Sequence, residues 1–241
     1  MSDEWSVDTL IVGSSYSSTC TLVMNDKHRI IVDSGLSLDQ AALERALHIR
    51  RLEPSDIDIV INTHLHLDHC GNNVLFPRAV VFASCREWEW AHAFYAALFS
   101  SRTPEQAAEE FYPELRSYEL APRTIRNAAR LARLFWRPER LGDVSRRRWI
   151  ETDELPHGLE ALSTPGHTPF HLSIRVRAAL VLIAGDAVLA EAPDAKVRTM
   201  VPYSRADFLA TREVLINENA IIVPGHGPRF STHPSRPSNS R

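Results

Sequence analysis

A short apolar run followed directly by a histidine-rich segment constrains this chain more than any other feature. Residues 57–61 (Ile-Asp-Ile-Val-Ile) are rich in β-branched side chains, which predicts a buried strand. Residues 63–69 (Thr-His-Leu-His-Leu-Asp-His) follow at its C-terminal end, where α/β folds tend to place their sites. His64 and His66 are two positions apart, so on extended backbone both imidazoles leave from the same side.

The second half of this segment changes direction. Asp68 continues the alternation of His64 and His66, whereas His69 breaks it, which indicates that the chain turns there. Four potential ligands can therefore face one small volume. Three neutral imidazoles and one carboxylate suit zinc or another borderline divalent ion. The alternative is a solvated histidine-rich loop that binds no metal.

Further ligand-type side chains follow apolar runs or lie within Pro/Gly turns downstream. They are found in residues 164–168 (Thr-Pro-Gly-His-Thr), in Gly185-Asp186 after the apolar run 179–184, and in residues 224–227 (Pro-Gly-His-Gly) after the run 221–223. The order is HxHxDH, then a distant His, a distant Asp and a last His. With all seven positions filled, the chain resembles the metallo-β-lactamase-fold hydrolase superfamily. In motif style it is most similar to acyl-homoserine lactonase-like members.

This resemblance implies both a fold and a metal centre. The fold is of the α/β class, a four-layer αββα sandwich of two mixed β-sheets with a helical insert. The cofactors are two divalent metal ions, with zinc favoured and manganese, iron or cobalt as alternatives. The implied ligands are His64, His66 and His167 for the first ion, Asp68, His69 and His226 for the second, and Asp186 as a bridge between the two. Asp68 is also the implied catalytic residue, because it can orient the attacking hydroxide or shuttle its proton.

The implied reaction is hydrolysis. A metal-bridging hydroxide would attack the carbonyl of a lactone, ester or thioester. Residues 63–77 and the helical insert are similar to those of acyl-homoserine lactonases. Those enzymes have a tyrosine three residues after the bridging aspartate, hydrogen-bonding the substrate carbonyl, and this chain has Leu189 there. Whether Tyr203 or a residue of the insert replaces that tyrosine stays open.

The insert is predicted from a change in pattern. Little strand signal appears from Cys85 to about Trp149. Thr103, followed by Pro104, has the N-cap pattern of one helix, and another helix is predicted over 122–137. We therefore expect a single domain over residues 1–230, with a helical insert at about 86–147. Aromatic residues crowd its first predicted helix and would form an acyl-binding wall or a homodimer contact: Trp88, Trp90, Phe94, Tyr95 and Phe99.

One helix of the insert carries a stripe of arginines spaced three and four residues apart. They are Arg123, Arg126, Arg130, Arg133, Arg137 and Arg140. One interpretation is a solvated face that pairs with acidic residues of the previous helix. The other is a wall that binds anions, which would favour a phosphodiesterase or nuclease acting on RNA. The second interpretation is the alternative to the carbonyl hydrolase.

Composition limits the partners and the compartment. The net charge of −3 predicts no general attraction to nucleic acid or membrane. Three cysteines, an odd number without framework spacing, favour free thiols in a reducing compartment. The N-terminus lacks the apolar core of a signal peptide, and no apolar run is long enough to span a membrane. We expect a soluble cytoplasmic protein with a small-molecule substrate and, from its Pro/Ser content, a disordered tail at 231–241.

A few residues beside the motif have two interpretations. Asp33 is either a turn former or a carboxylate that orients a ligand imidazole, and His171 is a candidate for the same supporting role. Cys70 is predicted to be a packed thiol rather than a ligand. Ser37, with Gln40 three residues on, predicts a capping box at the start of a helix.

Overall fold

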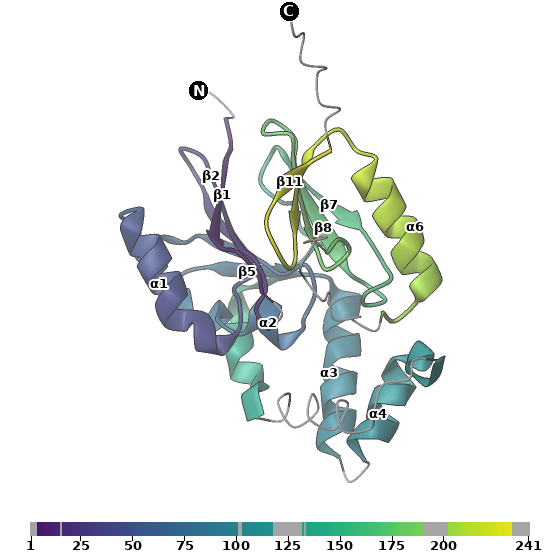
Figure 1. Cartoon of the computed structure of the whole chain (residues 1–241). Coiled ribbons are helices and arrows are strands. Elements are labelled where there is room, and N and C mark those ends of the chain that lie inside the picture. Colours follow the sequence, from purple (N-terminus) through teal and green to yellow (C-terminus); the bar gives the residue numbers. More distant parts are fainter. Residues whose placement is uncertain are drawn as a thin grey trace, which may run out of the picture.

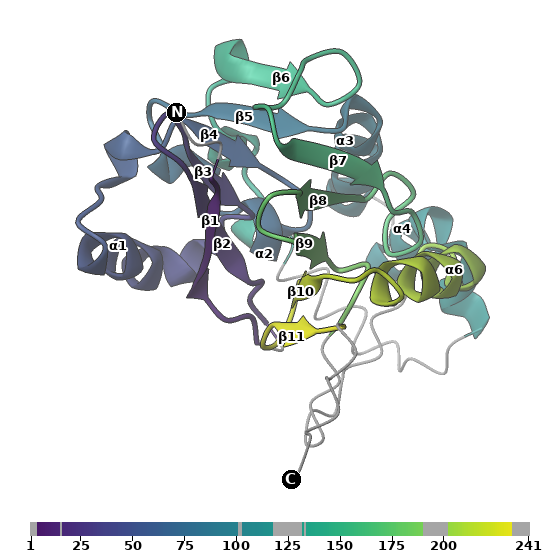
Figure 2. The same cartoon turned by 90° about the horizontal axis from the view of Figure 1, so that it is seen from above.

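Two mixed β-sheets pack face to face, and helices cover their outer faces (Figure 1). The computed structural model describes residues 4–14, 16–100, 103–117, 132, 134–189 and 202–232. Seen from above, the layers run from helix α1 (Gln40–Ile49) through the two sheets to helix α6 (Arg205–Ile216) (Figure 2). The predicted αββα sandwich is confirmed.

The first sheet contains six strands in chain order. They are β1 (Ser6–Ile11), β2 (Cys20–Met24), β3 (Arg29–Val32), β4 (Ile59–Ile61), β5 (Val80–Ala83) and β6 (Arg147–Trp149). β1, β2 and β3 pair antiparallel, and β3 through β6 pair parallel. Because parallel strands end at the same edge, β3 and β4 bring their C-terminal residues together.

The second sheet is also mixed. Its strands are β7 (Leu159–Ser163), β8 (Leu172–Val176), β9 (Val181–Gly185), β10 (Ile221–Pro224) and β11 (Phe230–Ser231), in the order β11-β10-β9-β8-β7. Among the described strands of this second sheet, only β9 and β10 pair parallel. Asp186 and His226 follow these two strands, so the parallel pairing places both residues at one edge of the sheet.

Alternation along the strands divides the apolar side chains between two faces. Ile59 and Ile61 lie in the core between the sheets, whereas Val60 packs in the cluster under α1. In the second sheet Ile183 faces the central core and Leu182 packs in the cluster that contains Leu215 of α6. This period of two is the geometry of extended backbone. It explains why strands covered on both faces appear as continuous apolar runs.

The start of α1 differs from the sequence prediction. Ser37 and Gln40 do not form the predicted capping box: residues Ser37–Asp39 form a 3₁₀ turn, η1, and Asp39 is the N-cap of α1. The Asp39 carboxylate accepts a hydrogen bond from the Leu36 amide at 3.0 Å and another from the Ser17 hydroxyl. Asp39 therefore has partners both at the turn and on a distant loop.

The insert packs at one end of the sandwich (Figure 1). Its described elements are α3 (Cys85–Phe99), α4 (Pro104–Phe111), and the 3₁₀ turns η4 (Pro113–Ser117), η5 (Pro138–Leu141) and η6 (Val144–Arg146). Thr103 caps α4 by accepting from the Gln106 amide, as predicted. The ring of Tyr95 stacks on that of Trp136 with centroids 3.8 Å apart, which anchors α3. Most of the helix predicted over 122–137 lies outside the described residues.

The shorter turns are η2 (Pro54–Asp56), η3 (Asn73–Leu75) and the four-residue helix α2 (Leu67–Cys70). None of the helices in the described part of the chain has the length and apolarity needed to cross a bilayer. Ser231, the first residue of the predicted tail, belongs to β11 and pairs with Ile221 of β10. Residues 233–241 lie outside the described ranges.

Candidate metal centre

Every side chain that the sequence marked as a ligand follows the end of a strand. His64 lies three residues beyond β4, Asp186 directly follows β9, and His226 lies two residues beyond β10. His167 lies in the loop between β7 and β8. These strand ends meet where the two sheets face each other. The local approach is close: a Cβ on Gly225 would lie 1.9 Å from Asp186 Oδ1, so only glycine leaves room for the carboxylate there.

The HxHxDH segment turns as expected, and the turn begins at Leu67. His66 still has extended backbone (φ −70°, ψ 150°) and is the N-cap of α2, whereas Asp68 and His69 lie within that helix. His64 and His66 thus project from extended chain, and Asp68 and His69 from a helical turn. The change of backbone lets four side chains from six consecutive residues approach one volume from two directions.

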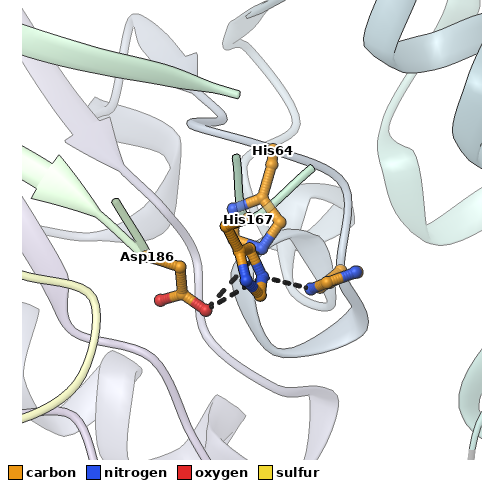
Figure 3. Close-up of side chains that lie close together, drawn as sticks. His64, His167 and Asp186 are labelled. Carbon is orange, nitrogen blue, oxygen red and sulfur yellow. Dashed lines mark hydrogen bonds and ion pairs between the residues drawn. The ribbon is translucent and has the colours of Figure 1, made fainter. Parts of the chain in front are cut away.

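Four residues make up the first group. Ligand-type atoms of His64, His66, His167 and Asp186 all lie within 4.8 Å of one another. His66 Nδ1 lies 2.9 Å from His167 Nε2. Asp186 Oδ2 lies 3.2 Å from His167 Nε2 and 3.9 Å from His64 Nε2. Figure 3 shows His64 and His167 directed toward this carboxylate.

Asp68, His69 and His226 make up the second group, again within 4.8 Å of one another. Asp68 Oδ2 lies 3.4 Å from His226 Nε2 and 3.8 Å from His69 Nε2. The other oxygen of Asp186 faces this group: Oδ1 lies 3.2 Å from His69 Nε2 and 3.4 Å from His226 Nε2. The two carboxylate oxygens of Asp186 therefore face different groups.

The donor set fits a pair of cations. Nε2 of His64, His69 and His226 and Oδ1 of Asp186 are buried and have no hydrogen-bond partner among the described residues. Buried polar atoms in folded proteins are nearly always paired, so a concentration of unpaired ones calls for a bound species. Imidazole and carboxylate donors suit zinc and related divalent ions.

Burial keeps the histidines of the first group neutral. It lowers the pKa of His64 and His167 well below the usual value, and lowers the pKa of His66 to about 4 even though Asp68 and Asp186 act in the opposite direction. A neutral imidazole has a free lone pair, the form that binds a metal ion. These three residues thus offer lone pairs at neutral pH.

In the second group, neighbouring carboxylates raise the pKa values of both histidines. Burial lowers the pKa of His226, but the carboxylates of Asp186 and Asp68 outweigh it and raise that pKa to about 9. Burial likewise opposes the charged form of His69, yet Asp186, Asp33 and Asp68 hold its pKa well above the usual value. The excess of negative charge here is what a cation would neutralise.

The structure decides the interpretation of Asp33. Its Oδ2 lies 2.7 Å from His69 Nδ1 and accepts from the Thr63 hydroxyl at 2.8 Å, and its Oδ1 accepts from the Thr63 amide at 2.8 Å. Asp33 also occupies a turn with φ 58°. The carboxylate therefore orients the His69 ring so that Nε2 faces Asp186.

His171 and Cys70 support the site without belonging to either group. The Asp186 amide donates to His171 Nε2 at 3.1 Å, and Nδ1 of the same ring lies 2.8 Å from the Thr164 hydroxyl. His171 thus fixes the backbone at Asp186. Cys70 is buried, and its thiol donates to the His66 carbonyl, which agrees with a packed thiol.

Two residues of the insert were not predicted as part of the site. Tyr112, just beyond α4, has its hydroxyl oxygen 2.6 Å from His66 Nε2. Glu87, in α3, is 1% exposed and bonds to residues beside His64 and His167. A glutamate within a predicted helix gives no sequence signal of burial. Tyr112 carries only the weak signal of an aromatic residue before a proline.

Tyr203, the named candidate for the missing lactonase tyrosine, has described contacts with His167 and Trp90 and none with Asp186. The Tyr203 amide donates to the His167 carbonyl at 3.1 Å, and its ring packs near Trp90.

Within the arginine stripe only Arg137 and Arg140 are described. Arg137 donates to the Trp136 carbonyl, and Arg140 donates to the Gly71 carbonyl. Arg123, Arg126, Arg130 and Arg133 lie outside the described residues.

The sandwich of two sheets thus carries a cluster of Asp and His side chains at its strand ends. A family model described as the metallo-beta-lactamase superfamily matches residues 15–226. The chain belongs to the metallo-beta-lactamase superfamily, and the predicted membership of this superfamily is confirmed.

Individual relatives agree with this assignment. A probable metallo-hydrolase of Methanocaldococcus jannaschii is 44% identical over 59 residues, 24% of this chain and 29% of that protein. An N-acyl homoserine lactonase of a Bacillus species is 27% identical over 184 residues, 72% of this chain and 57% of that protein. This chain thus matches less than two thirds of the length of either relative.

Solved structures share the fold. AidC, described as a dizinc quorum-quenching lactonase in complex with a product, superposes with a TM-score of 0.60 at 19% identity. The match covers 91% of this chain and 76% of that one. At this level of identity the likeness concerns the fold.

Proposed function

We propose that this protein is a dinuclear-metal hydrolase that cleaves the carbonyl–oxygen bond of a lactone, with esters and thioesters as related substrates. One observation carries the proposal: Asp186 directs one carboxylate oxygen to each of two ligand groups. Two cations held side by side repel each other, and a shared carboxylate offsets part of that repulsion. The similarity to an N-acyl homoserine lactonase favours a lactone among carbonyl substrates.

The proposed ligands follow the two groups. His64, His66 and His167 would hold one ion, Asp68, His69 and His226 the other, and Asp186 would join both. When bound, two divalent cations would lower the pKa of water at this site to about 7 and would polarise the substrate carbonyl. Zinc is the first choice, and manganese, iron and cobalt suit the same donors.

Asp68 is the proposed catalytic residue. Its side chain is 23% exposed, whereas that of Asp186 is 1% exposed, so Asp68 lies at the accessible rim of the site. A carboxylate in that position can accept a hydrogen bond from the attacking water, fix its direction and hold the proton that it releases. The same carboxyl can then return the proton to the alkoxide of the opened lactone.

The aromatic side chains of the insert are the proposed acyl-binding wall. Tyr112 contacts His66 through its hydroxyl and packs its ring against Trp90 and Phe94, with centroids 5.5 and 5.4 Å away. Trp90 and Phe94 are partly exposed. An apolar acyl chain lying on these rings would place its carbonyl end toward the ligand groups, because Tyr112 spans the distance between wall and site.

The test is metal analysis of the purified protein followed by a substrate screen. We expect two equivalents of divalent metal, hydrolysis of N-acyl lactones, loss of activity after chelation and recovery on adding Zn²⁺. Cleavage of phosphodiesters together with inertness toward lactones, esters and thioesters would replace the proposal with the alternative function. The main-chain contacts of Arg137 and Arg140 do not favour that alternative, and the remaining arginines of the stripe lie outside the described residues.

A further inference from the structure

A buried carboxylate of the insert joins the two loops that carry the first ligand group. Glu87 lies in the first turn of α3. Its Oε2 accepts a hydrogen bond from the Thr168 hydroxyl at 2.8 Å, and its Oε1 accepts from the Leu65 amide at 3.3 Å. The Phe170 amide also donates to this carboxyl. All these donors are main-chain or hydroxyl groups, and none is a charged partner.

The partners of Glu87 are sequence neighbours of three proposed ligands. Leu65 lies between His64 and His66, and Thr168 follows His167. The first loop leaves β4 of the first sheet, and the second leaves β7 of the second sheet. The carboxylate of Glu87 therefore connects loops that belong to different sheets.

The other end of α3 strengthens this connection. The Tyr95 hydroxyl donates to the Leu65 carbonyl at 3.3 Å. Leu65 thus has both its amide and its carbonyl bonded to side chains of one helix. Because the Tyr95 ring is stacked on Trp136 in a buried cluster, α3 is a firm support for that peptide.

Burying such a carboxylate is costly, and the cost requires a compensating role. A buried carboxyl without a charged partner destabilises a fold unless its oxygens are hydrogen-bonded. Here the bonds hold peptides whose neighbours must meet closely, since His66 Nδ1 and His167 Nε2 lie 2.9 Å apart. Small shifts of either loop would separate these nitrogens.

We infer that Glu87 is a positioning residue that sets the distance between the His64–His66 loop and the His167 loop, and that the first metal group therefore depends on the insert helix for its affinity. This inference rests on the proposed function, because it takes His64, His66 and His167 as ligands. It gives the insert a second role beside contact with the substrate.

The test is Zn²⁺ titration of the metal-free protein in competition with a chromogenic chelator. We expect Glu87→Gln to bind one equivalent of Zn²⁺ about tenfold more weakly, as for other residues that support metal ligands, and to bind the other as the wild type does. An Asp68→Ala background identifies the affected group, since it weakens the second group and leaves the first. Glu87→Gln in that background should weaken the remaining equivalent by the same factor.

Glu151→Gln is the matched control. The Glu151 carboxylate accepts from the Ser84 hydroxyl at 2.6 Å and from the Cys85 amide at 3.0 Å, so it supports the same end of α3 without bonding to either loop. We expect wild-type affinity for both equivalents in this variant. A general loosening of α3 would instead weaken Zn²⁺ binding in both variants alike, which would overturn the inference.

Thr168→Val provides a second variant if Glu87→Gln does not fold. It removes one bond to Glu87 and preserves the shape of the side chain, and we expect a smaller loss of affinity for the same equivalent. Two outcomes separate the claims. Wild-type protein that binds no Zn²⁺ would overturn the proposed function, whereas wild-type protein with two equivalents and unchanged affinities in Glu87→Gln and Thr168→Val would overturn this inference alone.

Discussion

The hydroxyl oxygen of Tyr112 lies 2.6 Å from Nε2 of His66, so a residue of the insert contacts a proposed metal ligand directly. Nδ1 of the same ring faces His167 Nε2. The neutral imidazole carries one proton, and a proton on Nε2, donated to Tyr112, leaves the Nδ1 lone pair directed into the first group. We therefore expect the contact with Tyr112 to favour the His66 tautomer that is protonated on Nε2.

Replacing Tyr112 by Phe tests this tautomer selection. The ring contacts with Trp90 and Phe94 remain, so we expect the fold to persist, while Zn²⁺ affinity falls about tenfold because the His66 proton is no longer fixed. Competition with a chelator measures the affinity. Unchanged binding would mean that packing alone orients His66. Tyr203→Phe is the control, because no described contact links its hydroxyl to a ligand.

The proposed bridging role of Asp186 predicts a loss of bound metal and activity that no single histidine substitution would match. Asp186→Ala removes an oxygen from each group, so we expect it to lower the bound metal and to abolish nearly all hydrolysis of any substrate found. Asp186→Asn keeps the shape and removes the charge. The metal content of the Asp186→Ala variant is measured by elemental analysis, and its activity is measured in parallel. Full activity with two metals still bound would refute the bridging assignment.

Asp33 is expected to contribute to stability as well as to orientation. Asp33→Ala leaves the Thr63 amide, the Thr63 hydroxyl and His69 Nδ1 without their acceptor in a buried site. We expect the free energy of unfolding of the metal-free protein to fall by about 3 kcal/mol. Urea denaturation measures it. Thr63→Val removes the hydroxyl with its contacts to Asp33 and to His64 Nδ1 and keeps the amide bond, so it should cost about 1 kcal/mol; equal losses would contradict the assignment.

The buried carboxyl of Glu87 predicts a pH dependence of stability. Burial raises its pKa from the ordinary 4.5 to about 7, although the hydrogen bonds from Thr168, Leu65 and Phe170 oppose the shift. Between these two values the folded chain keeps a proton that the unfolded chain has lost. The stability that this proton contributes is complete below the lower value and is lost as the pH rises through about 7.

Comparison with Glu87→Gln isolates this contribution, because glutamine does not titrate. We expect the free energy of unfolding of the metal-free wild type, relative to that of the variant, to fall between about pH 5 and about pH 8. Urea denaturation at both pH values provides the measurement. A parallel course for the two proteins would show that Glu87 has an ordinary pKa.

Salt dependence separates carbonyl hydrolysis from the nuclease alternative. For a neutral lactone we expect kcat/KM to change little with ionic strength, and the variant Arg126→Ala/Arg130→Ala/Arg133→Ala to retain it. Phosphate contacts would instead make log activity fall steeply with log salt. A steep salt dependence toward RNA that disappears in the triple variant would support the second function.

Local patterns in the sequence predicted the strands that precede the candidate ligands, and the resemblance to a known superfamily implied the layers and the division of the ligands into two groups. β4 (Ile59–Ile61) and β9 (Val181–Gly185) form at the predicted runs 57–61 and 179–184, because β-branched and apolar runs favour buried extended chain. The ends of these strands position the side chains that follow them. The alternation of His64 and His66 follows from the same backbone geometry. The strands and this alternation depend on residues that are adjacent in the sequence, so they can be predicted from it.

Contacts between distant segments were decided only by the folded chain. Asp33 reaches His69 across 36 positions, and Tyr112 reaches His66 across 46. Asp39, rather than Ser37, is the N-cap residue of α1, and its carboxylate accepts a hydrogen bond from Ser17, 22 positions away. Such bonds depend on how the insert and loops pack, and no local preference encodes that. The sequence by itself thus identified the candidate metal ligands, whereas the tertiary structure decided which residues hold those side chains in place.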